Sequence, residues 1–295
     1  MLIMRTLTTS VTKVASAPPL TADADEKLLH FIQQHPRLVV LTGAGVSTDS
    51  GIPDYRDARG EWKQKQPVQH QAFMTQPAVR QRYWARSLPG WPVIRDAQPN
   101  GAHFSLAEME RNGHLQLLVT QNVDRLHQKA GSDRVTDLHG RSDQVVCMAC
   151  HYRTERDAVH QRATEINPEF TAIKAIAAPD GDAHVEMDFS QFRVPDCSKC
   201  GGILKPDVVF FGDNVPKQRV ESSLKALRAS DGLLVIGSSL MVFSGFRFCR
   251  RAAEWGIPIA TLSLGCTRAD ELSQLQINAP IRETLEQVCS VLGTN

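Results

Sequence analysis

Short apolar runs followed by turn residues recur along the chain and predict buried strands. The runs are Leu38 to Leu41, Leu117 to Thr120, Val135 to Leu138, Val208 to Phe211, Leu233 to Ile236 and Ile257 to Leu262. Between them the apolar positions take helical spacing, over the stretches Glu26 to His35, Ala102 to Arg111, Lys217 to Ala229 and Ile281 to Leu292. This alternation predicts an α/β fold with a Rossmann-like parallel sheet covered on both faces.

Ligands of such sheets bind outside the carboxyl ends of the strands, so the residues that follow each run are candidates for a site. They are glycines and short polar residues: Gly43-Ala44-Gly45, Gln121-Asn122-Val123-Asp124, His139-Gly140, Gly212-Asp213, Gly237-Ser238-Ser239 and Ser263-Leu264-Gly265. We therefore expect the site at this edge of the sheet.

Two segments interrupt the alternation. Residues 57–101 are rich in Gln, Arg, Trp and Pro and predict a helical insert, and residues 141–202 hold two C-x-x-C pairs around a polar middle. The predicted organisation is a flexible tail over 1–25 and one catalytic domain over 26–295, whose Rossmann-like parts are 26–140 and 203–295.

The paired cysteines predict a zinc-binding module over 141–202. Four thiolates, from Cys147, Cys150, Cys197 and Cys200, suit a closed tetrahedral zinc site. The 46 residues between the pairs exceed the roughly 15 to 20 of a compact ribbon, so the module carries an insertion. A four-cysteine site has no open position for water, so we expect one structural zinc and chemistry elsewhere. The remaining cysteines are expected to be small core residues: Cys249, Cys266 and Cys289.

The overall charge and the pattern of cysteines indicate which kinds of partner and which compartment to expect. The 295 residues include 33 Lys and Arg against 32 Asp and Glu, so the overall charge does not favour nucleic acid or an anionic membrane surface. The apolar stretch Leu233 to Phe243 is shorter than the roughly 18 to 20 residues of a membrane span. The C-x-x-C pairs suit a reducing compartment, so we expect a cytoplasmic protein without specific nucleic-acid or membrane partners. Residues 1–22 contain two basic residues and no acid; a flexible tail is favoured over the alternative, a transit peptide for the mitochondrial matrix.

Two features point to chemistry at the sheet edge. Gly43 and Gly45 follow a strand, where a glycine turn lets the backbone approach a pyrophosphate. Thr48 replaces the third glycine of G-x-G-x-x-G, so a plain tight turn is the alternative. His139 follows another strand, and an imidazole with a pKa of about 6.5 accepts a proton near neutral pH. That position favours a catalytic base, although a solvated histidine has the same spacing.

Several motifs, in order over about residues 26 to 290, resemble the signature of sirtuins. They are Gly43 to Ser47, Ser50 to Arg56, Thr120 to Asp124 with Leu126-His127, Leu138 to Gly140, Leu204 to Gly212 and Gly237 to Leu240, with the cysteine pairs among them. The segments Tyr83 to Arg86 and Ser244 to Phe248 look most like the class II, mitochondrial-sirtuin-like branch.

The resemblance implies an NAD-dependent protein-lysine deacylase that consumes NAD as a co-substrate. The acyl-lysine amide oxygen would attack the nicotinamide ribose, giving nicotinamide, free lysine and acyl-ADP-ribose. His139 would deprotonate a ribose hydroxyl, and Asn122 and Asp124 would shape the nicotinamide pocket. A mono-ADP-ribosyltransferase using the same NAD site is the alternative. Retention of these three residues argues against a non-enzymatic NAD or zinc adaptor.

The same resemblance implies binding residues for both substrates. NAD would contact Gly43, Ala44, Gly45, Ser47, Ile52, Pro53, Asp54, Tyr55, Arg56, Gln121, Asn122, Val123, Asp124, Gly237, Ser238, Ser239, Ser263, Leu264, Gly265 and Ile281. The acyl-lysine protein would add a strand against Val209, Phe211, Gly212, Val242 and Phe243. Tyr55 stands where many sirtuins have Phe, and Ser263 where many have Asn; neither change removes a catalytic group.

The segment Pro77 to Leu88 predicts a helix, because proline suits its first turn and Pro89 would end it. Tyr83 and Arg86 then share one face. In sirtuins that prefer acidic acyl groups, a Tyr and an Arg at this spacing sit at the inner end of the acyl pocket, so the resemblance implies that this pair binds a distal carboxylate. The alternative is a solvated Arg86 and a Tyr83 packed on the core, and the preferred acyl group stays open.

Overall fold

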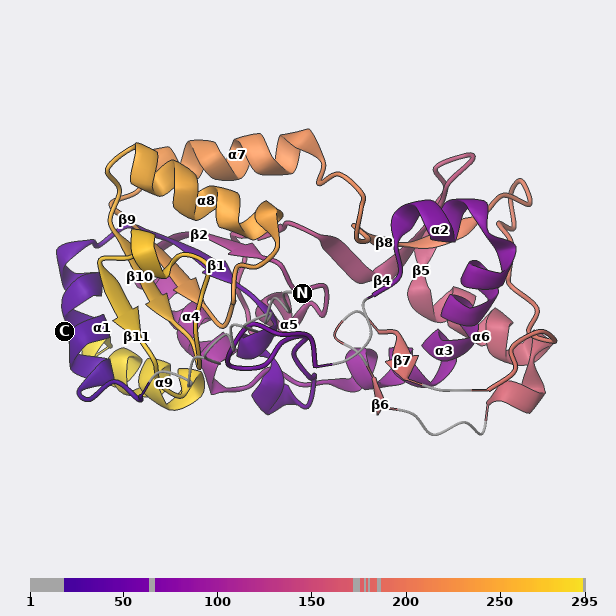
Figure 1. The fold of residues 1–295 in the computed structure, drawn as a ribbon, viewed down its shortest axis with the longest axis horizontal. Coiled ribbons are helices and arrows are strands. Elements are labelled where there is room, and N and C mark those ends of the chain that lie inside the picture. The colour runs from indigo at the N-terminus through magenta and orange to yellow at the C-terminus, as the bar shows by residue number, and fades with distance from the viewer. Residues whose placement is uncertain are drawn as a thin grey trace, which may run out of the picture.

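The computed structural model describes residues 19–63, 67–171, 176–177, 179, 181–184 and 187–293. Its larger part is built on a six-stranded sheet, at the left of Figure 1. The strands in spatial order are β11 (Leu275–Ile277), β10 (Ile259–Leu262), β9 (Gly232–Ile236), β1 (Leu38–Thr42), β2 (Leu115–Thr120) and β3 (Val135–Asp137). Every neighbouring pair is parallel, which confirms the predicted Rossmann-like α/β fold.

Helices cover both faces of this sheet. They are α1 (Ala24–Gln34), α4 (Gly101–Arg111) and α9 (Ile281–Leu292) on one face, and α7 (Lys217–Arg228) and α8 (Phe243–Glu254) on the other. Successive side chains of a strand point to opposite faces, so Val40 packs with the first group and Val39 with the second. Burial on both sides explains why β1 is apolar without alternation. Helix α8 was not among the helical stretches predicted from the sequence.

The strand order reverses between β1 and β9. From β1 the chain moves outward to β2 and β3, and from β9 it moves the other way to β10 and β11. At such a reversal a crevice opens beyond the carboxyl ends of the strands, where open α/β sheets bind ligands. The turns that begin at Gly43 and Gly237 follow these two strands and therefore meet at the crevice.

A smaller unit, at the right of Figure 1, contains an antiparallel sheet of β5 (Arg153–Glu155), β4 (Gly140–Cys147) and β8 (Leu204–Val208). The predicted parallel strand Val208 to Phe211 is wrong in extent and in partner. The strand that forms ends at Val208 and pairs antiparallel with β4, because the two zinc-binding turns lie side by side at its other end. Residues 209–211 leave the sheet, and Phe211 forms a bridge with Gln69.

The helical insert packs onto this small sheet. Its helices α2 (His70–Thr75) and α3 (Pro77–Asp96) bury Phe73, Tyr83 and Trp84 in one apolar cluster with residues of β4, β8 and α6 (Arg156–Ile166). Helix α3 continues through Pro89 and Pro92, so its predicted end at Pro89 is wrong. Burial of Trp91 and Ile94 beyond the prolines outweighs the roughly 3 kcal/mol cost of an interior proline.

Short elements complete the described chain. They are α5 (Leu126–Lys129), the hairpin of β6 (Ile176–Ala177) and β7 (Ala183–His184), and the 3-10 turns η1 (Ala44–Val46), η2 (Thr48–Ser50), η3 (Pro168–Phe170) and η4 (Asp270–Leu272). Of the tail predicted over 1–25, residues 1–18 lie outside the described residues, and the Thr21 N–H donates to Asn278 O at 2.8 Å. Among the helices that are described, none combines the length and the apolar character of a membrane span.

Candidate active site

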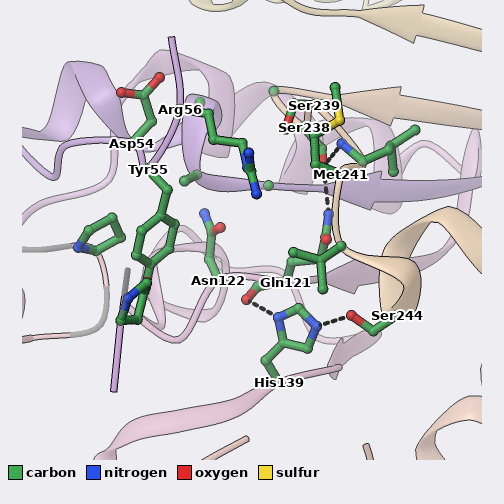
Figure 2. Close-up of a pocket in the computed structure, with 18 of the residues that line it drawn as sticks. Asp54, Tyr55, Arg56, Gln121, Asn122, His139, Ser238, Ser239, Met241 and Ser244 are labelled. Carbon is green, nitrogen blue, oxygen red and sulfur yellow. Dashed lines mark hydrogen bonds between the residues drawn. The ribbon is translucent and has the colours of Figure 1, made fainter. Parts of the chain in front are cut away.

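A cavity of about 640 Å³ lies at the carboxyl edge of the sheet, where the strand order reverses. Its walls come from the loops after β1, β2 and β9, the loop 54–63, the segment after β8 and the first turns of α8. Figure 2 shows Arg56 and Asn122 in the space between Tyr55 and His139. Residues from both halves of the chain therefore meet in one pocket.

The loop after β1 and the loop after β9 lie so close together that Gly43 and Gly237 have no room for a side chain. A Cβ on Gly43 would lie 2.7 Å from Cβ of Ser238, and a Cβ on Gly237 would lie 2.6 Å from the backbone nitrogen of Val46. Gly237 also has a φ of 61°, in the left-handed region that favours glycine. Both loops line the cavity, so these glycines hold together the part of the wall where the resemblance places the NAD phosphates.

Ser47 connects Asn122 to Asp124 through hydrogen bonds. The Asn122 amide donates to Ser47 Oγ at 3.1 Å, and Ser47 Oγ donates to Asp124 Oδ2 at 2.7 Å. The other Asp124 oxygen accepts the backbone N–H of Leu126 at 2.9 Å. Burial raises the pKa of Asp124. The amide and the carboxyl group are thus fixed side by side in the cavity wall, an arrangement that suits a planar amide such as nicotinamide.

His103 supports Ser47 from the buried side. The backbone N–H of Asn100 donates to His103 Nδ1 at 3.3 Å, so Nε2 carries the proton of the neutral ring and points to Ser47 Oγ at 3.5 Å. Burial lowers the pKa of His103 to about 4. A neutral imidazole therefore backs the pocket that contains Asn122 and Asp124.

His139 is held in a defined tautomer. Its Nδ1 lies 3.0 Å from the carbonyl oxygen of Gln121, which can only accept, so Nδ1 carries the proton. The lone pair on Nε2 then accepts the hydroxyl of Ser244 at 2.7 Å (Figure 2). Burial, together with the charges of Arg247 and Arg219, lowers the pKa of His139 to about 4. The ring is a neutral base at physiological pH, and Nε2 is its basic atom.

The loop 54–63 closes the cavity through aromatic contacts. Tyr55 packs edge-on against Trp62 at 6.1 Å and against Phe211 at 6.4 Å between ring centroids. The Arg56 guanidinium lies 4.0 Å over the Trp62 ring and donates to Gly60 O at 2.6 Å. The aromatic residues on both sides of the cavity therefore touch each other directly.

Most of the predicted binding residues line this cavity. They are Gly43, Ala44, Gly45, Ser47, Ile52, Asp54, Tyr55, Arg56, Gln121, Asn122, Val123, Asp124, Gly237, Ser238, Ser239, Ser263, Leu264 and Ile281 for NAD, with Val209, Phe211, Gly212, Val242 and Phe243 for the protein substrate. Pro53 and Gly265 are outside the lining and support it from neighbouring positions in the chain. The pocket thus contains most of both predicted sets, together with His139.

Tyr83 and Arg86 do not line this cavity. Tyr83 is 1% exposed and packs against Phe73 and Phe210, as the core interpretation expects. Arg86 is not solvated, because its Nε donates to Asp182 Oδ1 at 2.9 Å in a largely buried ion pair. The carboxylate that Arg86 contacts in the structure therefore belongs to the chain itself.

Several residues that line the cavity were not predicted from the sequence pattern. Trp62, Lys63, Pro179, Met241 and Arg247 follow no predicted strand, so their position relative to the sheet edge gave no signal. Cys249 and Cys289 are buried core residues, as expected. Cys266 is not: it is partly exposed and lines the cavity, because the backbone after β10 passes beside Ala58 of the closing loop.

The four predicted zinc ligands come together in the small unit. Their sulfur atoms all lie within 4.8 Å of one another, with 3.8 Å between Cys150 and Cys197 and 3.5 Å between Cys147 and Cys200. A tetrahedral zinc with bonds of about 2.3 Å would place its sulfur ligands roughly 3.8 Å apart. The donor set and spacing fit one structural zinc, which would join the end of β4 to the start of β8.

Comparison with known proteins shows that most of the chain is similar to proteins of one family. The Sir2 family model matches residues 43–244. The chain is 56% identical over 259 residues to an NAD-dependent protein deacetylase of Xanthomonas axonopodis pv. citri, covering 88% of each protein. It is 47% identical over 276 residues to the mitochondrial NAD-dependent protein lipoamidase sirtuin-4 of Bos taurus, covering 92% of this chain and 88% of that protein.

A solved complex of Sir2 with a p53 peptide and NAD+ has the same fold, with a TM-score of 0.72 and 27% sequence identity over 92% of this chain and 99% of that one. The similarity to sirtuin-4 agrees with the class II branch that the motifs indicate. On the ordered motifs, the parallel sheet, the cysteine cluster and these matches, the chain belongs to the Sir2 family.

Proposed function

We propose that this protein is an NAD-dependent protein-lysine deacylase. The observation that carries the proposal is the orientation of His139, whose basic Nε2 faces Ser244 in the same cavity that contains the glycine loops and the Asn122–Ser47–Asp124 chain. A neutral, oriented base beside a polar pocket supports abstraction of a proton from a hydroxyl near neutral pH. The names of the related deacetylases support the same reaction.

Each part of the cavity has a role in this reaction. NAD would lie along the loops after β1 and β9, with its carboxamide at Asn122 and Asp124. The acyl-lysine would enter from the side of Phe211 and Val242, so that its amide oxygen attacks the nicotinamide ribose and nicotinamide leaves. His139 would then take a proton from a ribose hydroxyl, which attacks the acyl carbon. A water molecule then adds to that carbon and the bond from the carbon to the lysine nitrogen breaks. The products are nicotinamide, free lysine and acyl-ADP-ribose, with one water consumed.

The zinc is assigned a structural role only. Four thiolates fill a tetrahedral site, so the ion would stabilise the small unit without contacting the substrate. The cytoplasmic location expected from the cysteine pattern remains a prediction.

The experiment that tests the function combines the protein with NAD and an acetyl-lysine peptide and follows the products by mass spectrometry. Equal amounts of nicotinamide, free-lysine peptide and acyl-ADP-ribose are expected, and the His139→Ala variant should form the last two far more slowly. Peptide that gains the mass of ADP-ribose while keeping its acetyl group would show the alternative, ADP-ribose transfer.

A further inference from the structure

Arg247 lies at the substrate end of the cavity without a role in the reaction described above. It lines the cavity from α8, three residues after Ser244 and therefore on the same face of the helix. Helical side chains lean toward the helix N-terminus, and the Arg247 guanidinium accordingly lies over the Phe243 ring, 5.3 Å from its centroid. Its charge also reaches His139, whose pKa it helps to lower.

The Arg247 side chain has unused hydrogen-bonding capacity. Its Nε atom is buried and has no hydrogen-bond partner, and among the described residues no carboxylate forms an ion pair with it. A buried donor that has lost water and gained no partner destabilises the folded chain. An arginine is rarely left in this state in a closed core, but it is expected where a ligand supplies the acceptor.

The carboxylates of the cavity wall are already engaged. Asp54 pairs with Lys63, Asp57 pairs with Arg59, Asp124 accepts the Ser47 hydroxyl, and Asp213 accepts the backbone N–H of Asn214 at 2.8 Å. Each of the four has another partner, and none of them forms an ion pair with Arg247.

A second cation, Arg219 on α7, adds to the positive charge beside His139, whose pKa it also lowers. Across the described part of the chain, the side chain of Arg219 likewise forms no ion pair. The two guanidinium groups thus both contribute positive potential at His139. This potential favours an anionic ligand at the end of the cavity that Arg247 lines.

We propose that Arg247 binds a carboxylate of the acyl-peptide substrate and makes the enzyme select for it. This inference rests on the proposed function, in which the peptide lies between Phe211 and Val242, and Val242 is the N-cap of the helix that carries Arg247. A guanidinium fork fits a carboxylate through two parallel hydrogen bonds. The carboxylate has two possible sources: an Asp or Glu next to the acyl-lysine, or the distal carboxylate of an acidic acyl group.

The experiment uses the zinc-loaded full chain and two pairs of labelled peptides. One pair carries acetyl-lysine flanked by Glu or by Gln, and the other carries glutaryl-lysine or the uncharged pentanoyl-lysine between neutral residues. For each peptide, kcat/KM is measured with saturating NAD, and the peptide Kd is measured by fluorescence anisotropy without NAD. The Kd keeps the inference testable even if no peptide is turned over, an outcome that would count against the proposed function alone.

The variants are Arg247→Gln, which removes the charge, and Arg247→Lys, which keeps the charge without the fork. Arg250→Gln is the matched control, because Arg250 also lies near the Phe243 ring, at 5.9 Å, but pairs with Glu254 at 3.7 Å on the surface. Wild type should prefer the carboxylate member of one pair by roughly ten-fold, as expected for one charge-assisted contact at a half-exposed site. Which pair shows the preference identifies the source.

Arg247→Gln should reduce that preference to about one-fold, because kcat/KM should fall more for the carboxylate peptide than for its neutral partner. Arg247→Lys should keep part of the preference, and Arg250→Gln should keep all of it. The proposal is overturned if wild type prefers neither carboxylate, or if the preference survives in Arg247→Gln. Equal losses for charged and neutral peptides, or a higher KM for NAD, would also overturn it, because Arg247 would then act through His139 or on NAD.

Discussion

The Ser244 hydroxyl lies 2.7 Å from Nε2 of His139 and donates to the lone pair that the reaction requires. Gln121 fixes the opposite nitrogen through its carbonyl oxygen at 3.0 Å. His139→Ala should therefore lower acetyl-peptide turnover by about 10²- to 10⁴-fold, the usual contribution of a positioned base. Ser244→Ala should lower kcat by less than about ten-fold, because Gln121 still orients the ring.

Circular dichroism and melting temperature would show that both variants fold. Unchanged turnover in folded His139→Ala would contradict the assignment of the base.

The lowered pKa of His139 sets the acid limit of activity. Because burial holds this pKa at about 4 instead of 6.5, the ring stays neutral well below pH 6.5. We expect kcat/KM to show no decline centred on pH 6.5 as the pH falls from 7.5 to 5.5. Steady-state assays across this range, with enzyme checked for stability at each pH, measure it. An acid limb at 6.5 would mean that His139 titrates like a solvated histidine.

The same burial should make stability depend on pH. His103 and His139 have folded pKa values of about 4, below the unfolded value of 6.5, so between pH 6.5 and 4 the unfolded chain binds protons that the native chain does not. The free energy of unfolding should therefore fall as pH falls through this window, and level off below pH 4 for these two groups. Urea midpoints of wild type and His103→Gln compare the slopes, and the variant should be less steep.

Zinc should contribute folding free energy through the four cysteines. We expect one zinc per chain by metal analysis, and Cys197→Ser should lose the zinc and melt at a lower temperature, because the ligand set is then incomplete. Cys289→Ser is the matched control, since this buried thiol lies on α9 and donates to Ser105 O. It should keep one zinc per chain. Stable wild-type protein without zinc would contradict the metal site.

Alanine variants of Gly237 and Gly256 distinguish the effect of backbone strain from the effect of the contact between the two loops. Both have positive φ, at 61° and 68°, but a Cβ on Gly256 would meet nothing within 4 Å, whereas one on Gly237 would lie 2.6 Å from Val46 N. Gly256→Ala should cost about 1 to 2 kcal/mol of stability and leave the KM for NAD unchanged. Gly237→Ala should cost more and raise that KM by separating the two loops. Equal KM values in both variants would refute the loop contact.

The ion pair between Arg86 and Asp182 predicts a structural effect of the Arg86→Leu variant. Removing one partner leaves a buried charge, which typically costs about 3 to 5 kcal/mol. Acetyl, succinyl and glutaryl peptides should then lose kcat/KM equally, and the double variant with Asp182→Leu should recover stability. A loss confined to the succinyl and glutaryl peptides would instead show that Arg86 reads the acyl carboxylate.

The sequence by itself determined the class of fold and most of the pocket. Strands such as β1 are continuous apolar runs because they are buried on both faces, and this pattern is visible without coordinates. The residues that follow parallel strands must gather at one edge of the sheet, so Asn122, His139 and Gly237 could be placed near one another from the order of elements alone. The two C-x-x-C pairs gave the zinc ligands directly, because adjacent thiolates in such pairs share one ion.

Only the tertiary structure decided which residues from outside that pattern meet. The partner of Arg86 is Asp182, 96 positions away, and nothing in the local spacing of either residue indicates the pair. Likewise, Val208 ends a strand of the small sheet because β4 offers an antiparallel partner, a choice that depends on non-local pairing. Local patterns report burial and backbone preference, whereas ion pairs and strand partners depend on which distant surfaces the folded chain brings into contact.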